Sequence, residues 1–463
     1  MAGNTATLAA GVARAVITPP VGVYLTGFAG RPPSTGVHDD LTATALVLAE
    51  RDPAGVILED SRVAIVALDL LGMYGDAIAP AIKREVERSS GIPPERVLLC
   101  CSHTHYGPVM HGEWEGGDAP DAVAYQAALP HHVAGAIATA AAALQPVTLA
   151  VGHGSVRAGI NRRERKADGR LVLGQNPDGT LDSEVIVWRF DPLGETPVEP
   201  GAPAGWVQHA PEPLAIVVNY ACHPVSLGGG TRLISADFPG VARDVVEHLA
   251  GGTALFLQGA CGNINPSLMG PDWDNPRRLG HALGAEAARA ALVAEPVNAG
   301  PLRLERRTAE LPALMPSSLE TARASVTQLE AESARLAVSG SLGQRWWNDG
   351  AVRRAHAALD AMERGTTLPP LEAPLSVLRL GDAALAANPS ELFCEIGMSI
   401  KQHSPFAHTA IAGYTDAIIW YVPTRAAYPE GGYEVDRACR VAPEAGELIE
   451  SISLELLRSL RGP

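Results

Sequence analysis

The sequence predicts an α/β fold, in which mixed sheets lie in layers with helices against their outer faces. Short, continuous apolar runs recur along the chain, and runs of this kind are typical of strands covered on both faces. Segments with the composition of helices separate these runs, as in layered α/β proteins. The chain has 463 residues, 46% of them hydrophobic, which is enough for a large core.

Each apolar run ends in a turn that carries polar side chains. The runs predict strands at 63–68, 97–101, 214–220, 254–257 and 383–387. Chemistry in sheets of this kind gathers beyond the carboxyl ends of the strands. We therefore expect the functional site in these turns.

Helices are predicted between the runs by helix-forming composition and by start and stop signals. They cover 76–89, 123–143, 237–250, 278–294 and, at the end of the chain, 444–460. Gly91 follows the first helix, and Gly251 and Gly252 follow the third, as helix ends require.

The segment 317–365 is polar and helix-forming, and Gly340, Gly343 and the tryptophan patch at 346–350 interrupt it. It predicts a helical hairpin inserted before the last catalytic strand of a single domain that spans 1–463. The pair Trp346 and Trp347 has two interpretations, lining of a substrate pocket or, more commonly, packing within the hairpin.

The charge balance excludes several classes of partner. Lys and Arg number 36 against 51 Asp and Glu, a net charge of −15, which disfavours nucleic acid and anionic membrane surfaces. Residues 1–13 lack the pattern of a signal peptide, and no run of about 18 apolar residues occurs. With six cysteines in no regular spacing, these features predict a cytoplasmic protein without stable membrane association. A homo-oligomer is compatible with them.

The segment 100–108, Cys-Cys-Ser-His-Thr-His-Tyr-Gly-Pro, follows a predicted strand and is the most informative stretch of the chain. In an extended chain, His103 and His105 would point the same way. They would then give one metal two imidazoles, or one imidazole with the other as a nearby acid or base. The alternative is a strand end whose histidines hydrogen-bond locally.

Further candidate ligands follow two other predicted strands. His223 comes after 214–220, and Glu391 comes after 383–387. A mononuclear zinc site needs three or four N or O ligands and an open position for water, so the residue types are suitable. The competing histidines are His111, His131, His132 and His153. Of these, His131 and His132 are expected on the solvated face of a helix.

Six short sequence blocks lie one after another along nearly the whole chain. They are AVITPP at 15–20 with TGF at 26–28 and GVHD at 36–39; SHTHYGP at 102–108; INR at 160–162; HPVS at 223–226 with ISAD at 234–237; NPSELF at 388–393; and YVPT at 421–424 with YE at 433–434. In this order the blocks resemble the catalytic domain of the neutral, non-lysosomal ceramidase family. The resemblance is specific for the superfamily and not for the substrate.

The resemblance implies a zinc-dependent hydrolase of amide bonds. It implies that Zn²⁺ is bound by His103, His223, Glu391 and Tyr421. It also implies that His105 is the catalytic histidine, and that Arg162 and Tyr433 hold the scissile carbonyl and its developing oxyanion. An imidazole suits proton transfer, and a guanidinium and a phenol suit the oxyanion. Without the resemblance, Tyr421 would be a strand-end tyrosine bonded to backbone and Arg162 a surface arginine.

The chain departs from the family's pattern in three ways. Asn265 stands where the family has a serine, and no β-sandwich domain follows the block at Tyr421. The family also enters the secretory route, whereas this sequence shows no signal peptide. We therefore expect the substrate to be an N-acyl compound that is smaller or more soluble than ceramide.

Three alternatives stay open. The same site would serve an ester or lactone hydrolase. A non-catalytic relative would keep the metal or ligand site but not the reaction. Thiol chemistry through Cys101 or Cys261 is the third, because both lie near the predicted site.

Overall fold

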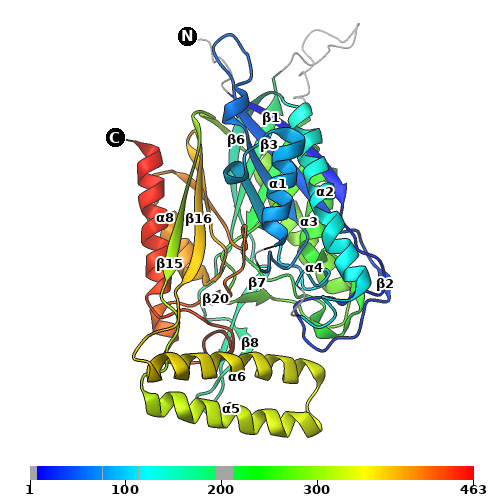
Figure 1. Ribbon diagram of the computed structural model, residues 1–463. Coiled ribbons are helices and arrows are strands. Elements are labelled where there is room, and N and C mark those ends of the chain that lie inside the picture. Colours follow the sequence, from blue (N-terminus) through cyan, green and yellow to red (C-terminus); the bar gives the residue numbers. More distant parts are fainter. Residues whose placement is uncertain (1–7, 76, 112–113, 194–211, 463) are drawn as a thin grey trace.

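The computed structural model describes residues 8–75, 77–111, 114–193 and 212–462. It confirms the α/β fold class and arranges the layers as helices, large sheet, small sheet, helices (Figure 1). In these ranges the large sheet has nine strands and the small sheet has four.

The large sheet is mixed. Its strands follow the order β12-β10-β9-β6-β1-β3-β4-β5, with β14 paired to β6. Their bounds are β1 Leu8–Val16, β3 Thr42–Glu50, β4 Val63–Leu68, β5 Val97–Cys101, β6 Gln145–Ser155, β9 Glu184–Pro192, β10 Ala215–Tyr220, β12 Thr253–Gln258 and β14 Glu295–Val297. The pairs β4–β5 and β10–β12 are parallel, and the other neighbours are antiparallel. Four of the predicted strands are β4, β5, β10 and β12.

The small sheet has the order β15-β16-β17-β19 and contains the fifth predicted strand, 383–387. Its strands are β15 Leu302–Leu311, β16 Leu371–Leu380, β17 Ala383–Ala387 and β19 His408–Ala412. Three short sheets complete the strands. They pair β2 (Gly36–Val37) with β11 (Leu233–Ile234), β7 (Gly159–Arg165) with β8 (Leu171–Asn176) and β13 (Ile264–Pro266), and β18 (Glu391–Leu392) with β20 (Tyr421–Val422).

Helices cover the outer faces of both sheets. The helices against the large sheet are α1 Ile78–Ser90, α2 Pro120–Ala142, α3 Asp237–Ala250 and α4 Asp274–Leu292. The small sheet is covered by α7 Cys394–His403 and α8 Ala445–Arg461. The predicted helices agree with these bounds to within a few residues, and α1 ends at Gly91 with φ +70°.

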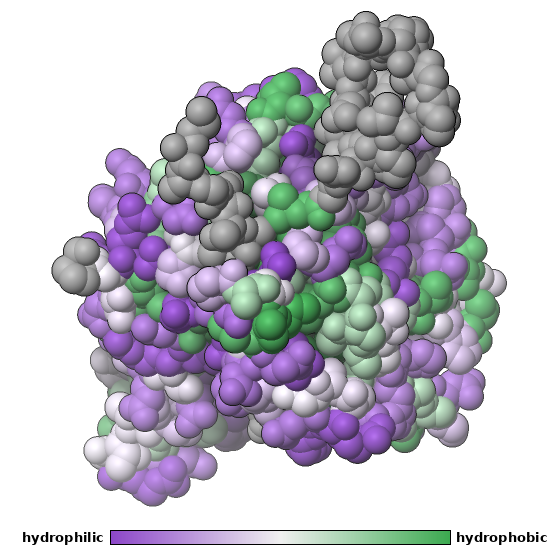
Figure 2. Space-filling view, turned by 90° about the horizontal axis from the view of Figure 1, so that it is seen from above, coloured by the Kyte–Doolittle hydropathy of each residue, from purple (hydrophilic) through white to green (hydrophobic). Residues whose placement is uncertain are grey.

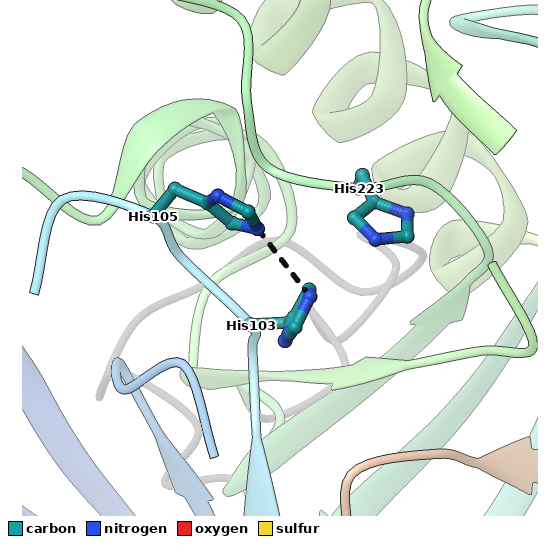
Figure 3. Close-up of side chains that lie close together, drawn as sticks. All are labelled: His103, His105 and His223. Atoms are coloured by element: carbon teal, nitrogen blue, oxygen red, sulfur yellow. Dashed lines mark hydrogen bonds between the residues drawn. The ribbon is translucent and has the colours of Figure 1, made fainter. Parts of the chain in front are cut away.

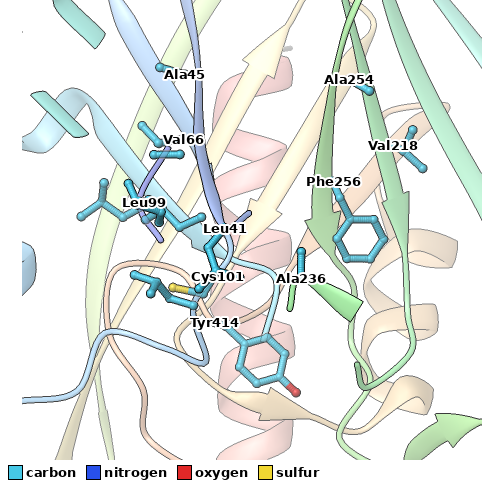
Figure 4. Packing of buried hydrophobic residues seen from close by; sticks show 14 of the residues in the cluster. Leu41, Ala45, Val66, Leu99, Cys101, Val218, Ala236, Ala254, Phe256 and Tyr414 are labelled. Atoms are coloured by element: carbon cyan, nitrogen blue, oxygen red, sulfur yellow. The ribbon is translucent and has the colours of Figure 1, made fainter. Parts of the chain in front are cut away.

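The strand residues alternate between two cores, which explains why their apolar runs are continuous. In β4, Val66 faces the helices and Ile65 faces the small sheet. In β17, Ala386 faces α7 and α8, while Leu385 faces the large sheet. Figure 4 shows the core on the helical side of the large sheet. A strand in an inner layer has no solvent face, so it has no polar alternation.

The predicted helical hairpin is present as α5 (Leu319–Ser339) and α6 (Leu342–Glu363), which lie together beneath the sheets (Figure 1). The expectation that Gly343 and 346–350 interrupt it was wrong, because both lie inside α6. Ser341 forms a capping box with Gln344 and starts α6 directly after the turn. Gly343 instead permits close packing, since a Cβ there would lie 2.2 Å from the carbonyl oxygen of Ala29.

The surface away from the hairpin carries small hydrophobic areas separated by hydrophilic residues (Figure 2). No helix within the described ranges is long and apolar enough to cross a membrane.

A buried ion pair connects the large sheet to α3. Asp69 follows β4, and Arg243 of α3 donates to both of its carboxylate oxygens at 2.7 Å. The backbone and hydroxyl of Thr42 donate to the same carboxylate at 2.8 and 2.9 Å. Both charged side chains are buried. Asp69 is therefore a structural residue, although it occupies a turn of the kind that carries the site.

Arg243→Ala is expected to lower the free energy of unfolding by about 3–5 kcal/mol, because it leaves the Asp69 carboxylate buried without its counter-ion. Urea denaturation measures the change. Arg277→Ala is the matched control, since Arg277 forms an exposed pair with Asp274 that contributes at most about 1 kcal/mol. Equal losses in the two variants would contradict the assignment.

Candidate metal and catalytic site

The predicted metal ligands meet at one end of the two sheets. His103 follows β5, His223 follows β10, and Glu391 and Tyr421 are the first residues of β18 and β20. These two short strands pair in parallel with Glu391 directly opposite Tyr421. Segments more than 300 residues apart in the chain therefore contribute to one cluster.

Three imidazoles turn toward one another in this cluster (Figure 3). The Nε2 atoms of His103 and His105 lie 3.4 Å apart, and each of the three histidines, with His223, offers a nitrogen within 4.8 Å of the others. The extended chain predicted at 103–105 is not observed. His103 has φ +68°, so the chain turns after Cys101, and this turn brings the two rings together at 84°.

A carboxylate and a phenol complete the donor set. Glu391 Oε2 lies 3.2 Å from Nε2 of His223 and 3.5 Å from Nε2 of His103. Tyr421 Oη lies 3.4 Å from Nε2 of His223. Ligands around a tetrahedral zinc ion, with bonds of about 2.0–2.1 Å, are separated by about 3.3 Å. The observed separations therefore suit donors that share one ion.

Hydrogen bonds to carbonyl groups orient two of the histidines. Nδ1 of His103 donates to the carbonyl oxygen of Leu71 at 2.7 Å, and Nδ1 of His223 donates to that of Cys261 at 2.7 Å. These bonds place the proton on Nδ1 and leave the Nε2 lone pair facing the cluster, as in metal-binding histidines.

His105 is held differently. Its Nδ1 is buried and has no hydrogen-bond partner among the described residues. Packing holds the ring, with Phe28 at 5.0 Å between ring centroids and Gly27 directly against it. A Cβ at Gly27, which has φ +90°, would lie 2.3 Å from Nδ1 of His105. The position of His105 thus depends on a glycine in the first sequence block.

The electrostatics of the cluster suit metal binding. Burial, with the charge of Arg162, lowers the pKa of His223 to about 4, and burial also holds the pKa of His105 well below its usual range. Both imidazoles are therefore neutral at pH 7, the form that binds metals. Burial raises the pKa of Tyr421 well above its usual range, despite Arg162. A divalent cation is what would stabilise its phenolate.

Arg162 is buried beside these donors, so the surface alternative for this residue was wrong. Its Nε donates to Glu434 at 2.7 Å, and its Nη1 donates to Asn265 at 3.2 Å and lies 3.3 Å from Nε2 of His223. The guanidinium carbon lies 5.1 Å from the centre of the Tyr421 ring, and the remaining Nη2 is buried with no hydrogen bond among the described residues. One donor of this guanidinium is thus left for a ligand.

Tyr433 closes the cluster on the side of the hairpin. Its ring lies 5.8 Å from that of Tyr421 and 6.2 Å from that of Trp347. The structure therefore brings together all seven residues that the sequence blocks singled out. Of the competing histidines, His131 and His132 are exposed on α2, and His153 contacts Glu184 and His408. The fourth, His111, lines a neighbouring cavity and does not belong to the histidine cluster.

Comparison with known proteins gives one kind of match. No family model and no curated protein matches the sequence. Among solved structures, the neutral ceramidase from Pseudomonas aeruginosa matches with a TM-score of 0.70 and 21% identity, over 98% of this chain and 74% of that one. A ceramidase complexed with C2 matches with a TM-score of 0.71 and 22% identity, over 98% and 75%. The chain has the neutral ceramidase fold. The fold implied by the six sequence blocks is thereby confirmed.

Two residues of the cluster received no role from the sequence. Glu434 accepts from Arg162 and also from Nη1 of Arg163 at 2.9 Å, so it fixes the guanidinium in the site. Its place beside Tyr433 in the sixth block was the available signal. Tyr414 stacks on His103 with ring centroids 3.9 Å apart. It belongs to no block, and no pattern in the sequence indicated it.

The two cysteines near the site are unsuited to thiol chemistry. Cys101 and Cys261 are fully buried, and burial raises the pKa of each thiol well above its usual range. The thiolate is the reactive form, so thiols of this kind are inert at neutral pH. The candidate site therefore depends on nitrogen and oxygen donors.

Proposed function

We propose that this protein is a zinc-dependent hydrolase that cleaves the carbon–nitrogen amide bond of a small N-acyl substrate. One observation carries the proposal. Donor atoms of His103, His223, Glu391 and Tyr421 converge at separations that suit the binding of a single ion. The two ceramidases that share the fold support the amide class of substrate.

When bound, zinc supplies a water molecule whose pKa is lowered to about 7. His105 stands beside the donors as a neutral imidazole, the form that accepts a proton and passes it to a leaving nitrogen. Arg162 offers its unpaired Nη2 to the negative charge that develops on the carbonyl oxygen. The hydroxyl of Tyr433, across the ring contact with Tyr421, is assigned the second donor role.

Two other functions use the same residues. An ester or lactone hydrolase would need the same acid–base group and the same oxyanion donors. A non-catalytic binding protein would need neither, and its ligand could use the buried, unpaired nitrogens of His105 and Arg162. Turnover is therefore the property that separates it from the two hydrolases.

The purified protein is expected to contain about one zinc ion per chain and to lose activity with a strong chelator, because the donors fit one ion. Elemental analysis measures the metal. Activity is then compared on N-acyl amino acids, acylated amines, matched esters, and short- and long-chain ceramides. Added zinc should restore the activity of the chelated protein. A sample dialysed without chelator is the control.

The outcomes separate the candidates. Turnover of small amides with higher kcat/KM than long-chain ceramide supports the proposal. Preference for long-chain ceramide by tenfold or more, about 1.4 kcal/mol in transition-state binding, would make the protein a true ceramidase. Turnover of esters alone would favour the ester hydrolase, and bound zinc without any turnover would favour the binding protein.

A further inference from the structure

A cavity of about 250 Å³ with aromatic walls lies next to the candidate site, under the helical hairpin. Its apolar walls are chiefly the rings of Trp114, Trp346, Trp347 and Trp420. The rings of Trp114 and Trp420 stack 6.1 Å apart, and Trp347 meets Trp420 edge-on at 5.6 Å. The tryptophan pair of the hairpin therefore lines a pocket and does more than pack within the hairpin.

The cavity adjoins the candidate site through two of its tryptophans. Trp420 precedes Tyr421 in the chain, and its backbone lies in the left-handed region with φ +71°. Trp347 contacts the ring of Tyr433 at 6.2 Å. A substrate that extends from Tyr421 past Tyr433 would enter the cavity.

The cavity also contains cationic side chains. Arg353 and Arg354 of α6 line it, together with Arg440. A Cβ at Gly350 would lie 3.3 Å from Nη1 of Arg354 and 3.9 Å from Nη2 of Arg353, so these two guanidinium groups converge on one point. Within the described ranges, the residues that line the cavity include no carboxylate.

Two other arginines of the hairpin form ion pairs, whereas Arg353 and Arg354 do not within the described ranges. Arg323 pairs with Glu363, and Arg335 pairs with Glu332. Neither Arg353 nor Arg354 makes an ion pair with any residue that the structure describes. Burial, and after it the charge of Arg353, lowers the pKa of Arg354, so the charged form of Arg354 is disfavoured there. A bound anion would stabilise that form.

We propose that this cavity binds the far end of the substrate, and that this end consists of an apolar body terminated by a carboxylate. The body packs on the tryptophans, and the carboxylate accepts hydrogen bonds from Arg353 and Arg354. Guanidinium groups suit this role because they bind carboxylates with paired hydrogen bonds. The inference rests on the proposed function for the reaction, but it assigns the substrate class from separate residues.

Kinetics on matched substrates test the inference. Anilides of suberic and octanoic acid have acyl chains of equal length that end in a carboxylate or a methyl group. The double variant Arg353→Ala/Arg354→Ala should raise KM for the suberic anilide at least tenfold, about 1.4 kcal/mol. KM for the octanoic anilide and kcat for both should stay within twofold. Arg335→Ala, on the same hairpin, is the matched control, and Lys at both positions should restore part of the affinity.

Binding measured without turnover separates this inference from the proposed function. Titration of tryptophan fluorescence with 4-phenylbutyrate should saturate in the wild-type protein and weaken at least tenfold in the double variant. The neutral 4-phenylbutan-1-ol should bind weakly and equally to both. Binding that follows this pattern in a protein that hydrolyses no amide would keep the inference and overturn the function.

Two results would overturn the inference alone. One is amide hydrolysis in which the suberic and octanoic anilides have equal KM in wild type and double variant. The other is equal binding of 4-phenylbutyrate to the wild type and to a double variant whose circular dichroism spectrum is unchanged.

Discussion

Replacing His223 by alanine is expected to remove the metal and the activity together. Its Nε2 lies close to two other donor atoms of the cluster, at 3.2 Å from Glu391 Oε2 and 3.4 Å from Tyr421 Oη. Without it, three donors remain, and Arg162 loses a neighbour that helps to position it. Zinc measured by elemental analysis should fall from about one ion per chain to a trace.

The matched control for this prediction is His131→Ala. His131 is exposed on α2, so its removal should leave both zinc content and kcat unchanged. If the His223→Ala protein kept its full metal content, the ligand assignment of His223 would be wrong.

Replacing His105 by alanine is expected to keep the zinc and lower kcat by about 10²–10⁴-fold, the usual contribution of a positioned acid–base group. The expectation follows from how the ring is held. His103 and His223 have carbonyl partners that orient a lone pair toward the cluster, whereas His105 is placed by packing against Gly27 and Phe28.

Zinc content and kcat measured on the same preparations decide between two roles for His105. The three histidines lie close enough for all of them to bind one ion. If His105→Ala loses zinc as readily as His103→Ala, His105 is a ligand and the acid–base role belongs to another group.

Much of the fold could be predicted because strands of an inner layer appear in the sequence as continuous apolar runs. The runs that became β4, β5, β10, β12 and β17 are almost entirely apolar, with Asn219 of β10 as an interior exception. The runs do not indicate which sheet each strand joins. Strand 383–387 has the same composition as the others, yet it pairs with β16 and β19 in the second sheet. Pairing depends on contacts between distant segments, which a local pattern does not contain.

The candidate site was likewise predicted in part. The residue types at His103, His223 and Glu391 pointed to a metal, but only the order of six blocks joined them to Tyr421 and Arg162. The predicted extended chain at 103–105 failed because tertiary contacts hold His103 in the left-handed region, where its ring stacks on Tyr414. Gly343 was taken as a helix breaker, whereas a capping box and close packing on Ala29 determine its place.

The donors of the cluster come from both halves of the chain. His103 and His223 extend from the large sheet, whereas Glu391 and Tyr421 follow strands of the small sheet. A ligand shared by all four would act as a cross-link between the two layers, much as a disulfide joins two segments. By linkage, whatever free energy such a ligand gains from the assembled cluster also stabilises the docking of one sheet on the other. A change that weakens binding of the ligand would then also weaken the docking of the two sheets.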